Sequence, residues 1–183
     1  DVALAAATAF EQLDVRWLEE PLFMEDVVGH ARLKARSSVP VALGENLHTR
    51  FAFEAFMARD AVDVLQPDVA RAGGISEVCA IAALAAEHGL AVSLHTYGDG
   101  IALAASLHLA AAIDNSSVME FDYNENPLRS GLLQESLEPQ GGFMYPPDRP
   151  GLGVTLDLET LDRYRFGEDG DLALWRRPLH ATG

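Results

Sequence analysis

Short apolar segments alternate with amphipathic segments along the first two thirds of the chain, and this alternation limits the possible folds more than any other feature. The apolar segments have the length and composition of buried strands, whereas the amphipathic segments repeat apolar residues at helical spacing. We expect strands at residues 15–19, 39–43, 62–66, 90–94 and 117–121, and helices at residues 2–13, 28–36, 49–58, 76–88 and 100–113. Strands that alternate with helices in this way form parallel βαβ units.

The period of the alternation predicts an α/β fold of a particular kind. Strands that are apolar along nearly their whole length are buried on both faces, as in a parallel sheet covered by helices. The repeat length is close to that of a (β/α) TIM-type barrel, which has eight units in about 250 residues. A doubly wound open sheet is the alternative, but no glycine-rich phosphate-binding motif follows any expected strand.

The composition changes near residue 126, where proline and glycine become frequent. These residues favour turns over long helices or strands. We therefore expect a partial barrel over residues 1–125, and a turn-rich segment with a peripheral tail over residues 126–183 that packs on the barrel.

The overall charge and the cysteine content limit the class of partner. A formal net charge of −15 argues against nucleic acids and anionic membrane surfaces. The sequence has no apolar run of membrane-spanning length and no secretory signal pattern. The single cysteine, Cys79, fits the reducing cytoplasm and a small core position on a helix. We expect a cytoplasmic protein that acts on a small molecule.

A polar residue of a functional type stands at the end of each expected strand. These residues are Glu19, Glu45, Asp68, His95 and Glu120. In a barrel the carboxyl ends of the strands meet at one face, so residues far apart in the sequence would gather there. Carboxylates packed together repel one another, and a bound divalent cation removes this repulsion. Oxygen ligands favour Mg²⁺. Independent surface carboxylates are the alternative.

His95 and Asp68 are expected to act as a base and the group that orients it. Asp68 ends the strand before that of His95, so its carboxylate can bind one ring nitrogen and raise the basicity of the imidazole. A single histidine at a strand end can also be purely structural. Three other histidines fall on expected helices, where surface or packing roles are typical: His30, His88 and His108.

Five motifs carry a resemblance to a known family. They are Trp17-Leu18-Glu19-Glu20-Pro21, Gly44-Glu45-Asn46, Gln66-Pro67-Asp68 with Gly73-Gly74-Ile75, Ser93-Leu94-His95, and Met119-Glu120-Phe121. In order and spacing, residues 1–157 resemble the barrel of the mandelate racemase branch of the enolase superfamily. The muconate cycloisomerase branch has a lysine in place of Asp68, and the glucarate dehydratase branch has an asparagine in place of Glu45.

The resemblance implies a role for each strand-end residue. Glu19 and Glu45 would be two of three Mg²⁺ ligands, Asp68 and His95 the base, and Glu120 a group that assists at the substrate's carboxylate oxygen. It also implies that this is the C-terminal barrel portion of a homo-oligomeric enzyme. The third ligand, a Lys-x-Lys motif and a capping domain would lie upstream, and residues 126–183 would pack on the barrel and that cap.

The resemblance further implies abstraction of the proton α to a carboxylate, through an enolate. We expect a sugar-acid dehydratase, with a sugar acid as the small-molecule carboxylate substrate. A racemase or epimerase and a sugar-lactone cycloisomerase are the alternatives within the family, and a non-catalytic barrel fragment is the alternative of another class. Asn46 and Tyr97, which follow two of the strand ends, are expected to contact the substrate.

Overall fold

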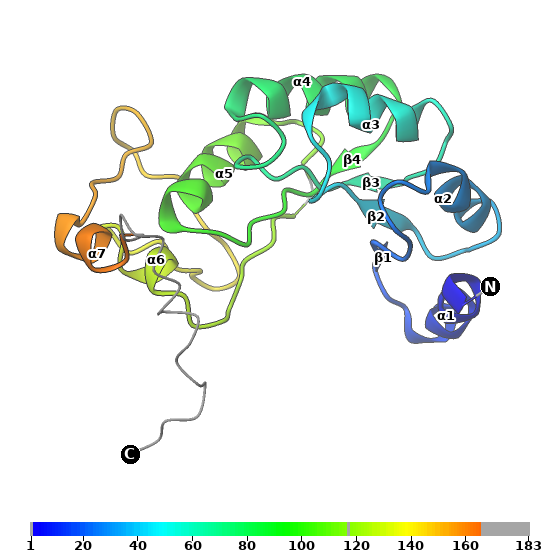
Figure 1. Ribbon diagram of the computed structural model, residues 1–183, viewed down its shortest axis with the longest axis horizontal. Helices are drawn as coiled ribbons and strands as arrows, with labels where there is room; N and C mark the ends of the chain where they lie inside the picture. The colour runs from blue at the N-terminus through cyan, green and yellow to red at the C-terminus, as the bar shows by residue number, and fades with distance from the viewer. Residues whose placement is uncertain (1, 117, 166–183) are drawn as a thin grey trace, which may run out of the picture.

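Four short parallel strands form the centre of the molecule. The computed structural model describes residues 2–116 and 118–165. The strands are β1 (Leu18–Glu19), β2 (Val41–Leu43), β3 (Val64–Leu65) and β4 (Ala91–Val92), and they pair in sequence order in one sheet (Figure 1). Leu18 pairs with Val41, Ala42 with Val64, and Val64 with Ala91. The parallel order agrees with the predicted βαβ units.

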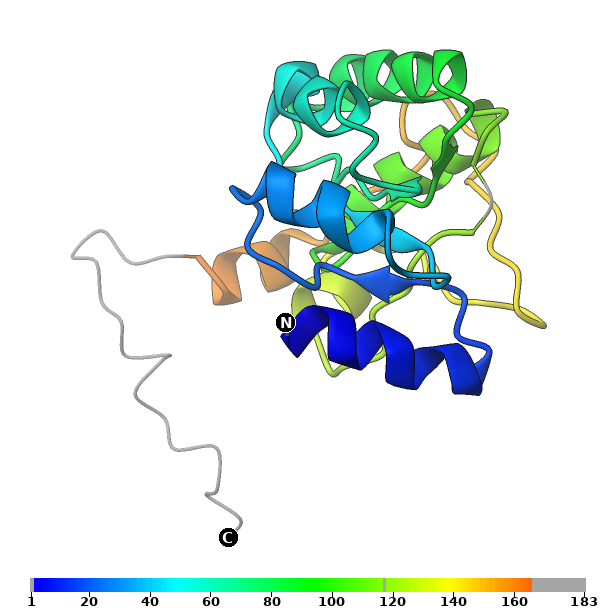
Figure 2. The same cartoon turned by 90° about the vertical axis from the view of Figure 1, so that its right-hand side faces the viewer.

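Helices alternate with these strands and cover one side of the sheet. They are α1 (Val2–Phe10), which a 3₁₀ turn η1 (Glu11–Leu13) follows, then α2 (Val27–Lys34), α3 (Thr49–Met57), α4 (Ile75–Glu87) and α5 (Gly100–Ala112). Figures 1 and 2 show α3 and α4 side by side on the outer side of the strands. All five helices lie where the spacing of apolar residues predicted them.

The core lies between the sheet and the outer helices. On α3, Phe53, Phe56 and Met57 recur at helical spacing and are buried, so this face packs against the strands. Ile81 on α4 and Leu65 on β3 have no exposed surface and belong to the same cluster. Burial of these side chains is the main force that holds the helices on the sheet.

Backbone pairing continues beyond the formal ends of the strands. The amide of Ser93 donates to the carbonyl of Leu65 at 2.9 Å, and the amide of His95 donates to the carbonyl of Pro67 at 3.3 Å. An isolated parallel bridge joins Asp68 to His95. This pairing extends the strand register into the loops at the carboxyl end of the sheet.

The prediction of a fifth strand at residues 117–121 is wrong for the part that the structure describes, residues 118–121, and residue 117 lies outside the described residues. This segment runs beside β4 but makes few bonds to it: a single bridge joins Val92 to Ser116, and the amide of Glu120 donates to the carbonyl of Leu94 at 3.2 Å. A regular strand needs a continuous ladder. On its other side the segment has no strand neighbour among the described residues.

Between residues 126 and 165 the chain forms few regular elements. This region contains two short helices, α6 (Pro127–Ser130) and α7 (Leu158–Arg163), and isolated bridges join Leu133 to Leu156 and Gln140 to Phe143. Leu133 is buried, and its side chain leaves no room for a Cβ at Gly100 on α5. The boundary at residue 125 stays a prediction, and residues 166–183 of the expected tail lie outside the described residues.

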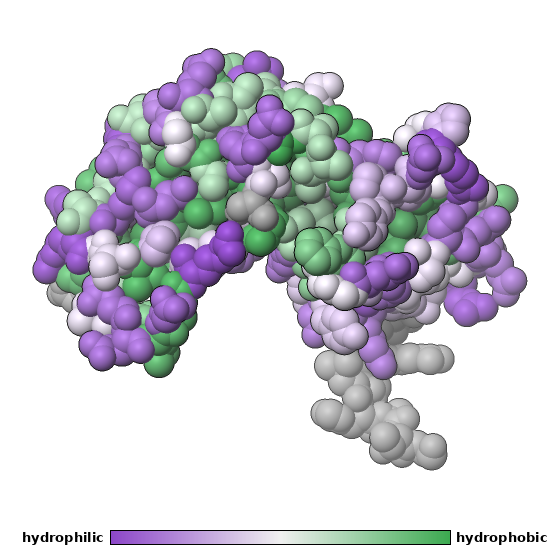
Figure 3. All heavy atoms as spheres, turned by 180° about the vertical axis from the view of Figure 1, so that it is seen from behind, coloured by the Kyte–Doolittle hydropathy of each residue, from purple (hydrophilic) through white to green (hydrophobic). Residues whose placement is uncertain are grey.

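The arrangement leaves a hollow on the side of the sheet opposite α3 and α4. Figure 3 shows the molecule as an arch with this hollow between its two ends. In the part of the chain that the structure describes, no helix is long and apolar enough to cross a membrane.

Candidate active site

The sequence places each predicted site residue at the carboxyl end of a strand or shortly after it. Glu19 is the last residue of β1, Glu45 follows β2, Asp68 follows β3 and His95 follows β4, whereas Glu120 lies in the segment beside β4. Because the strands are parallel, these positions fall at one edge of the sheet. The structure brings Glu45, Asp68 and Glu120 into direct contact with His95, whereas Glu19 bonds to Gln66 and Trp17.

His95 and Asp68 form a buried pair. The ring nitrogen Nδ1 of His95 lies 2.7 Å from Oδ2 of Asp68, and both residues are less than a tenth exposed. Asp68 is held in turn by the backbone amide of Ala70, which donates to Oδ1 at 2.7 Å. A carboxylate can only accept a hydrogen bond, so Nδ1 carries the proton of the imidazole in this pair. The lone pair of the neutral ring is therefore on Nε2.

The other ring nitrogen of His95 lies between two glutamates. Its Nε2 is 3.3 Å from Oε2 of Glu45 and 3.5 Å from Oε2 of Glu120. The latter oxygen also accepts a hydrogen bond from the amide of Thr96 at 3.0 Å. Burial lowers the pKa of His95, but the hydrogen bond to Asp68 and the charges of Glu120 and Glu45 outweigh it, so the pKa is raised above its ordinary value.

Amide and indole groups hold the two predicted metal ligands. Oε2 of Glu19 accepts from Nε2 of Gln66 at 2.7 Å and from Nε1 of Trp17 at 3.0 Å. Oε1 of Glu45 accepts from Nδ2 of Asn46 at 3.1 Å. Each carboxylate thus has one oxygen fixed by nitrogen donors. The sequence analysis assigned no role to Gln66. The sequence indicates only that this polar residue directly follows an apolar strand.

The donor chemistry of Glu19 and Glu45 fits Mg²⁺, which prefers oxygen ligands. Fixing one oxygen of each carboxylate orients the other, as hydrogen bonds to metal ligands commonly do. Within residues 2–116 and 118–165, no group of three or more His, Cys, Asp or Glu side chains could hold a metal ion. The chemistry of these two carboxylates therefore fits that of Mg²⁺ ligands.

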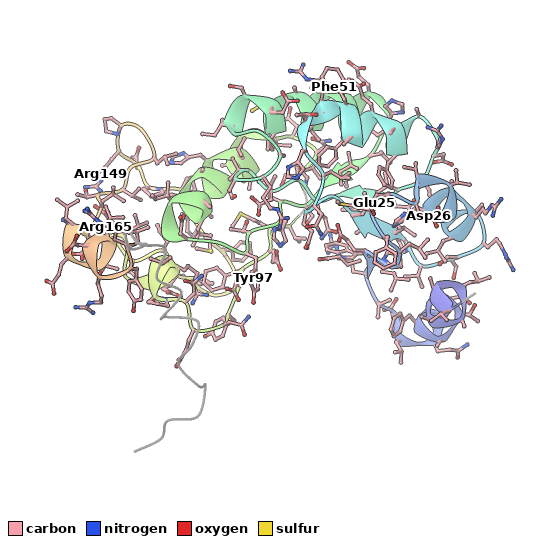
Figure 4. All side chains as sticks on the ribbon, viewed as in Figure 1. Glu25, Asp26, Phe51, Tyr97, Arg149 and Arg165 are labelled. Carbon is pink, nitrogen blue, oxygen red and sulfur yellow. The ribbon has the colours of Figure 1, made fainter. Side chains whose placement is uncertain are left out.

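The two predicted substrate contacts also lie at this edge. Asn46 donates to Oε2 of Glu20 at 2.8 Å, and it lines a cavity of about 570 Å³ together with Glu20 and Phe23. The ring of Tyr97 stacks on the imidazole of His95, with 6.3 Å between the ring centroids and 24° between the planes. Tyr97 projects toward the open side of the molecule in Figure 4.

A second cavity lies apart from this cluster. It has a volume of about 590 Å³ and is lined by apolar residues of α5, by the segment beside β4 and by residues 139–146. None of its lining side chains is titratable, so it offers no acid or base. The groups capable of acid–base chemistry are found in the cluster around His95 and not among the side chains that line this cavity.

Comparison with known proteins agrees with the geometry. Residues 1–161 match the family described as "Enolase C-terminal domain-like". Over 160 residues the chain is 38% identical to the D-galactarolactone cycloisomerase of Agrobacterium fabrum strain C58, covering 83% of this chain and 42% of the relative. Over 163 residues it is 37% identical to the arabinonate dehydratase of Saccharolobus solfataricus, covering 89% and 43% respectively.

The fold is also similar to that of a solved structure. The crystal structure of the 3,6-anhydro-D-galactonate cycloisomerase from Zobellia galactanivorans superposes with a TM-score of 0.83 at 36% identity, over 88% of this chain and 46% of that one. The chain spans less than half the length of these relatives. The match confirms the α/β fold as part of a TIM-type barrel. The chain therefore belongs to the enolase C-terminal domain-like family, as its strand-end motifs predicted.

Proposed function

We propose that this chain is the catalytic part of an enzyme that removes the proton α to a substrate carboxylate, with His95 as the base. The supporting observation is the imidazole itself, whose Nδ1 is held 2.7 Å from Asp68 and whose Nε2 faces two further carboxylates. A base must be oriented before it can take a proton from carbon, and the buried partner Asp68 supplies that orientation. A purely structural role for His95 would not explain why Glu45 and Glu120 lie around its Nε2.

Each site residue of this chain has a separate role in the proposed reaction. Neutral His95 accepts the α proton at Nε2, while Asp68 stabilises the resulting imidazolium through Nδ1. Glu120, when protonated, donates a hydrogen bond to a carboxylate oxygen of the substrate, where negative charge develops. Glu19 and Glu45 would hold Mg²⁺, which when bound stabilises the charge on those same oxygens. Asn46 and Tyr97 contact the substrate.

The proposed reaction is the dehydration of a sugar acid. After His95 has taken the α proton, the hydroxyl on the next carbon leaves, and the protonated imidazole can return its proton to that hydroxyl. The arabinonate dehydratase relative supports this reading. A sugar-lactone cycloisomerase is the second candidate, because two of the similar proteins are cycloisomerases. A racemase or epimerase would need only reprotonation.

A mass-spectrometric screen tests the proposal. The protein as expressed from its natural gene would be incubated with Mg²⁺ and a library of sugar acids and sugar lactones in deuterated water. Dehydration appears as the loss of one water, ring opening of a lactone as the acid product, and racemisation as one deuterium gained without other change. Absence of both turnover and deuterium incorporation across the library would favour the non-catalytic alternative.

We further propose that the remaining parts of the site come from sequence upstream of this chain. Among the residues that the structure describes, no group of three or more acidic, histidine or cysteine side chains could hold the ion, and β1 and β4 are the outermost strands of the sheet. The complete enzyme would be a cytoplasmic homo-oligomer. Mg²⁺ titration by calorimetry, on residues 1–183 and on the protein from its natural gene, tests this: equal affinities would contradict an upstream ligand.

A further inference from the structure

Tyr97 forms one wall of the space around the catalytic imidazole. Its ring stacks on His95, and 59% of the residue is exposed on the open side of the molecule (Figure 4). Its hydroxyl lies 3.1 Å from Nδ2 of Asn124, a residue 27 positions further along the chain. The loop after β4 and the segment after Phe121 thus meet at this hydroxyl.

The orientation of the Asn124 amide is determined by Asp122. Nδ2 of Asn124 lies 2.8 Å from Oδ1 of Asp122, and the backbone amide of Asn124 lies 2.9 Å from the same oxygen. The backbone amide can only donate, so Oδ1 of Asp122 is an acceptor, and the group of Asn124 that faces the same oxygen is the NH₂ group. The same NH₂ group faces Tyr97, whose hydroxyl oxygen is therefore the acceptor of that hydrogen bond.

Asp122 is itself held in place. It is 6% exposed, and Oδ2 lies 3.5 Å from Nη1 of Arg129. Arg129 also donates to the backbone carbonyls of Asp122 and Asn124, and its guanidinium lies 5.0 Å from the centre of the Phe121 ring. The guanidinium and the backbone amide of Asn124 can only donate to Asp122, so this carboxyl group is the acceptor in both contacts. These contacts fix the direction of each hydrogen bond in the series that leads from Arg129 through Asp122 and Asn124 to Tyr97.

The proton of the Tyr97 hydroxyl is left available by this arrangement. Its oxygen accepts from Asn124, and within residues 2–116 and 118–165 the hydroxyl donates to no acceptor. We propose that Tyr97 donates this hydrogen bond to a substrate oxygen beyond the reacting carbons, and that Asn124 is the residue that positions it. The inference rests on the proposed function, since it assigns one contact of the same sugar-acid site.

A purely structural role for the Asn124 contact is the competing explanation. The two loops are already joined by a second hydrogen bond, because Nδ2 of Asn126 donates to the carbonyl of Gly98 at 2.8 Å. Joining the loops therefore does not require the Tyr97 hydroxyl. A hydroxyl that served only to join them would also not need to stand beside the catalytic imidazole.

The test compares Tyr97→Phe, Asn124→Ala and the double variant in the protein from its natural gene. The probes are D-galactonate, D-xylonate, both enantiomers of arabinonate, and D-galactarolactone, with Mg²⁺ present. Tyr97→Phe keeps the stacked ring and removes only the hydroxyl, so KM should rise about three- to tenfold while kcat changes less than about twofold. Tyr123→Phe, which removes an exposed hydroxyl from the same segment, is the matched control and should leave both constants unchanged.

The double variant separates positioning from structure. If Asn124 acts through the hydroxyl, Asn124→Ala should raise KM in the wild-type background and add nothing to Tyr97→Phe. For an active probe, the analogue that lacks the contacted hydroxyl should be insensitive to Tyr97→Phe. Unchanged KM in Tyr97→Phe with an active wild type would overturn the contact, and additive effects would overturn the positioning role. A wild type inactive on all of these probes, without α-proton exchange, would overturn the proposed function as well.

Discussion

The region that ends near Glu120 and the region after residue 126 hold their polar groups in different ways. In the first, parallel backbone pairing between neighbouring strands brings Asp68 and His95 together over a core with no exposed surface at Phe53. In the second, exposed charged contacts such as the pair of Arg149 and Glu135 connect turns. A site that needs exact geometry is thus built on the register of a sheet.

The second region depends more on local conformation. Gly153 has a φ of +70°, and a Cβ at this position would lie 2.6 Å from the side chain of Pro147. Its carbonyl accepts from Nε of Arg149 at 3.0 Å. Few side chains of this region are buried, so its stability comes from such individual contacts. Four predictions test this contrast.

The largest effect is expected at His95, the proposed base. His95→Asn should reduce α-proton exchange of the substrate by about 10²–10⁴-fold, because a positioned general base contributes about that factor. Exchange would be followed by NMR in deuterated water on the protein from its natural gene. His88→Asn, at an exposed position after α4, is the control and should exchange normally. Undiminished exchange in His95→Asn would remove this residue from the mechanism.

A core substitution should separate the two regions in stability. Phe53→Ala should lower the free energy of unfolding by about 3–5 kcal/mol, because it leaves a cavity under α3. Phe143→Ala, in the turn-rich region where the residue is 68% exposed, should change it by less than about 0.5 kcal/mol. Urea denaturation followed by circular dichroism measures both. Similar losses would show that the second region shares the core.

Two helix caps give a smaller effect of the same kind. Asp99 accepts from the amides of Ile101 and Ala102 at the start of α5, so Asp99→Ala should cost about 1 kcal/mol. Asp157 caps the short helix α7, which buries none of its residues. Asp157→Ala should therefore loosen α7 locally with less effect on global unfolding. Hydrogen exchange of the amides of each helix distinguishes local from global opening.

The smallest effect is expected at Glu135, and it should depend on pH. The amide of Thr155 and the side chain of Arg149 lower the pKa of Glu135 to about 2. A lowered carboxyl pKa contributes stability that is present above the unfolded value near 4.5 and lost as pH falls toward 2. Glu135→Gln should therefore be less stable than wild type at pH 6, and the difference should vanish between pH 4.5 and 2. A pH-independent difference would show that the charge is not responsible.

The sequence located the predicted site residues because the ends of strands can be recognised in it. An apolar run followed by a polar residue marks where a strand leaves the core, and this located Asp68 and His95 correctly beside each other. The fifth strand was not predicted correctly. Its apolar residues suit a strand, but a strand also needs partners, and residues 118–121 bond to β4 at too few points to form a ladder.

The partners of the site residues were harder to foresee. Gln66 reaches Glu19 across 47 positions of sequence, and Asn124 reaches Tyr97 across 27. Neither pair has a spacing rule, because loop paths and side-chain rotamers determine which donors meet which acceptors. No pattern in a single chain distinguishes Gln66 from any other polar residue at a strand end.

The sequence alone determined the βα alternation, the acidic and histidine residues at the strand ends, and the family. These depend on local periodicity and residue type, which the order of amino acids states directly. Only the tertiary structure decided that Nε2 of His95 lies between Glu45 and Glu120 and that the Tyr97 hydroxyl accepts from Asn124. Hydrogen bonds require atoms within about 3 Å in fixed directions, and only the packed strands and loops provide those directions.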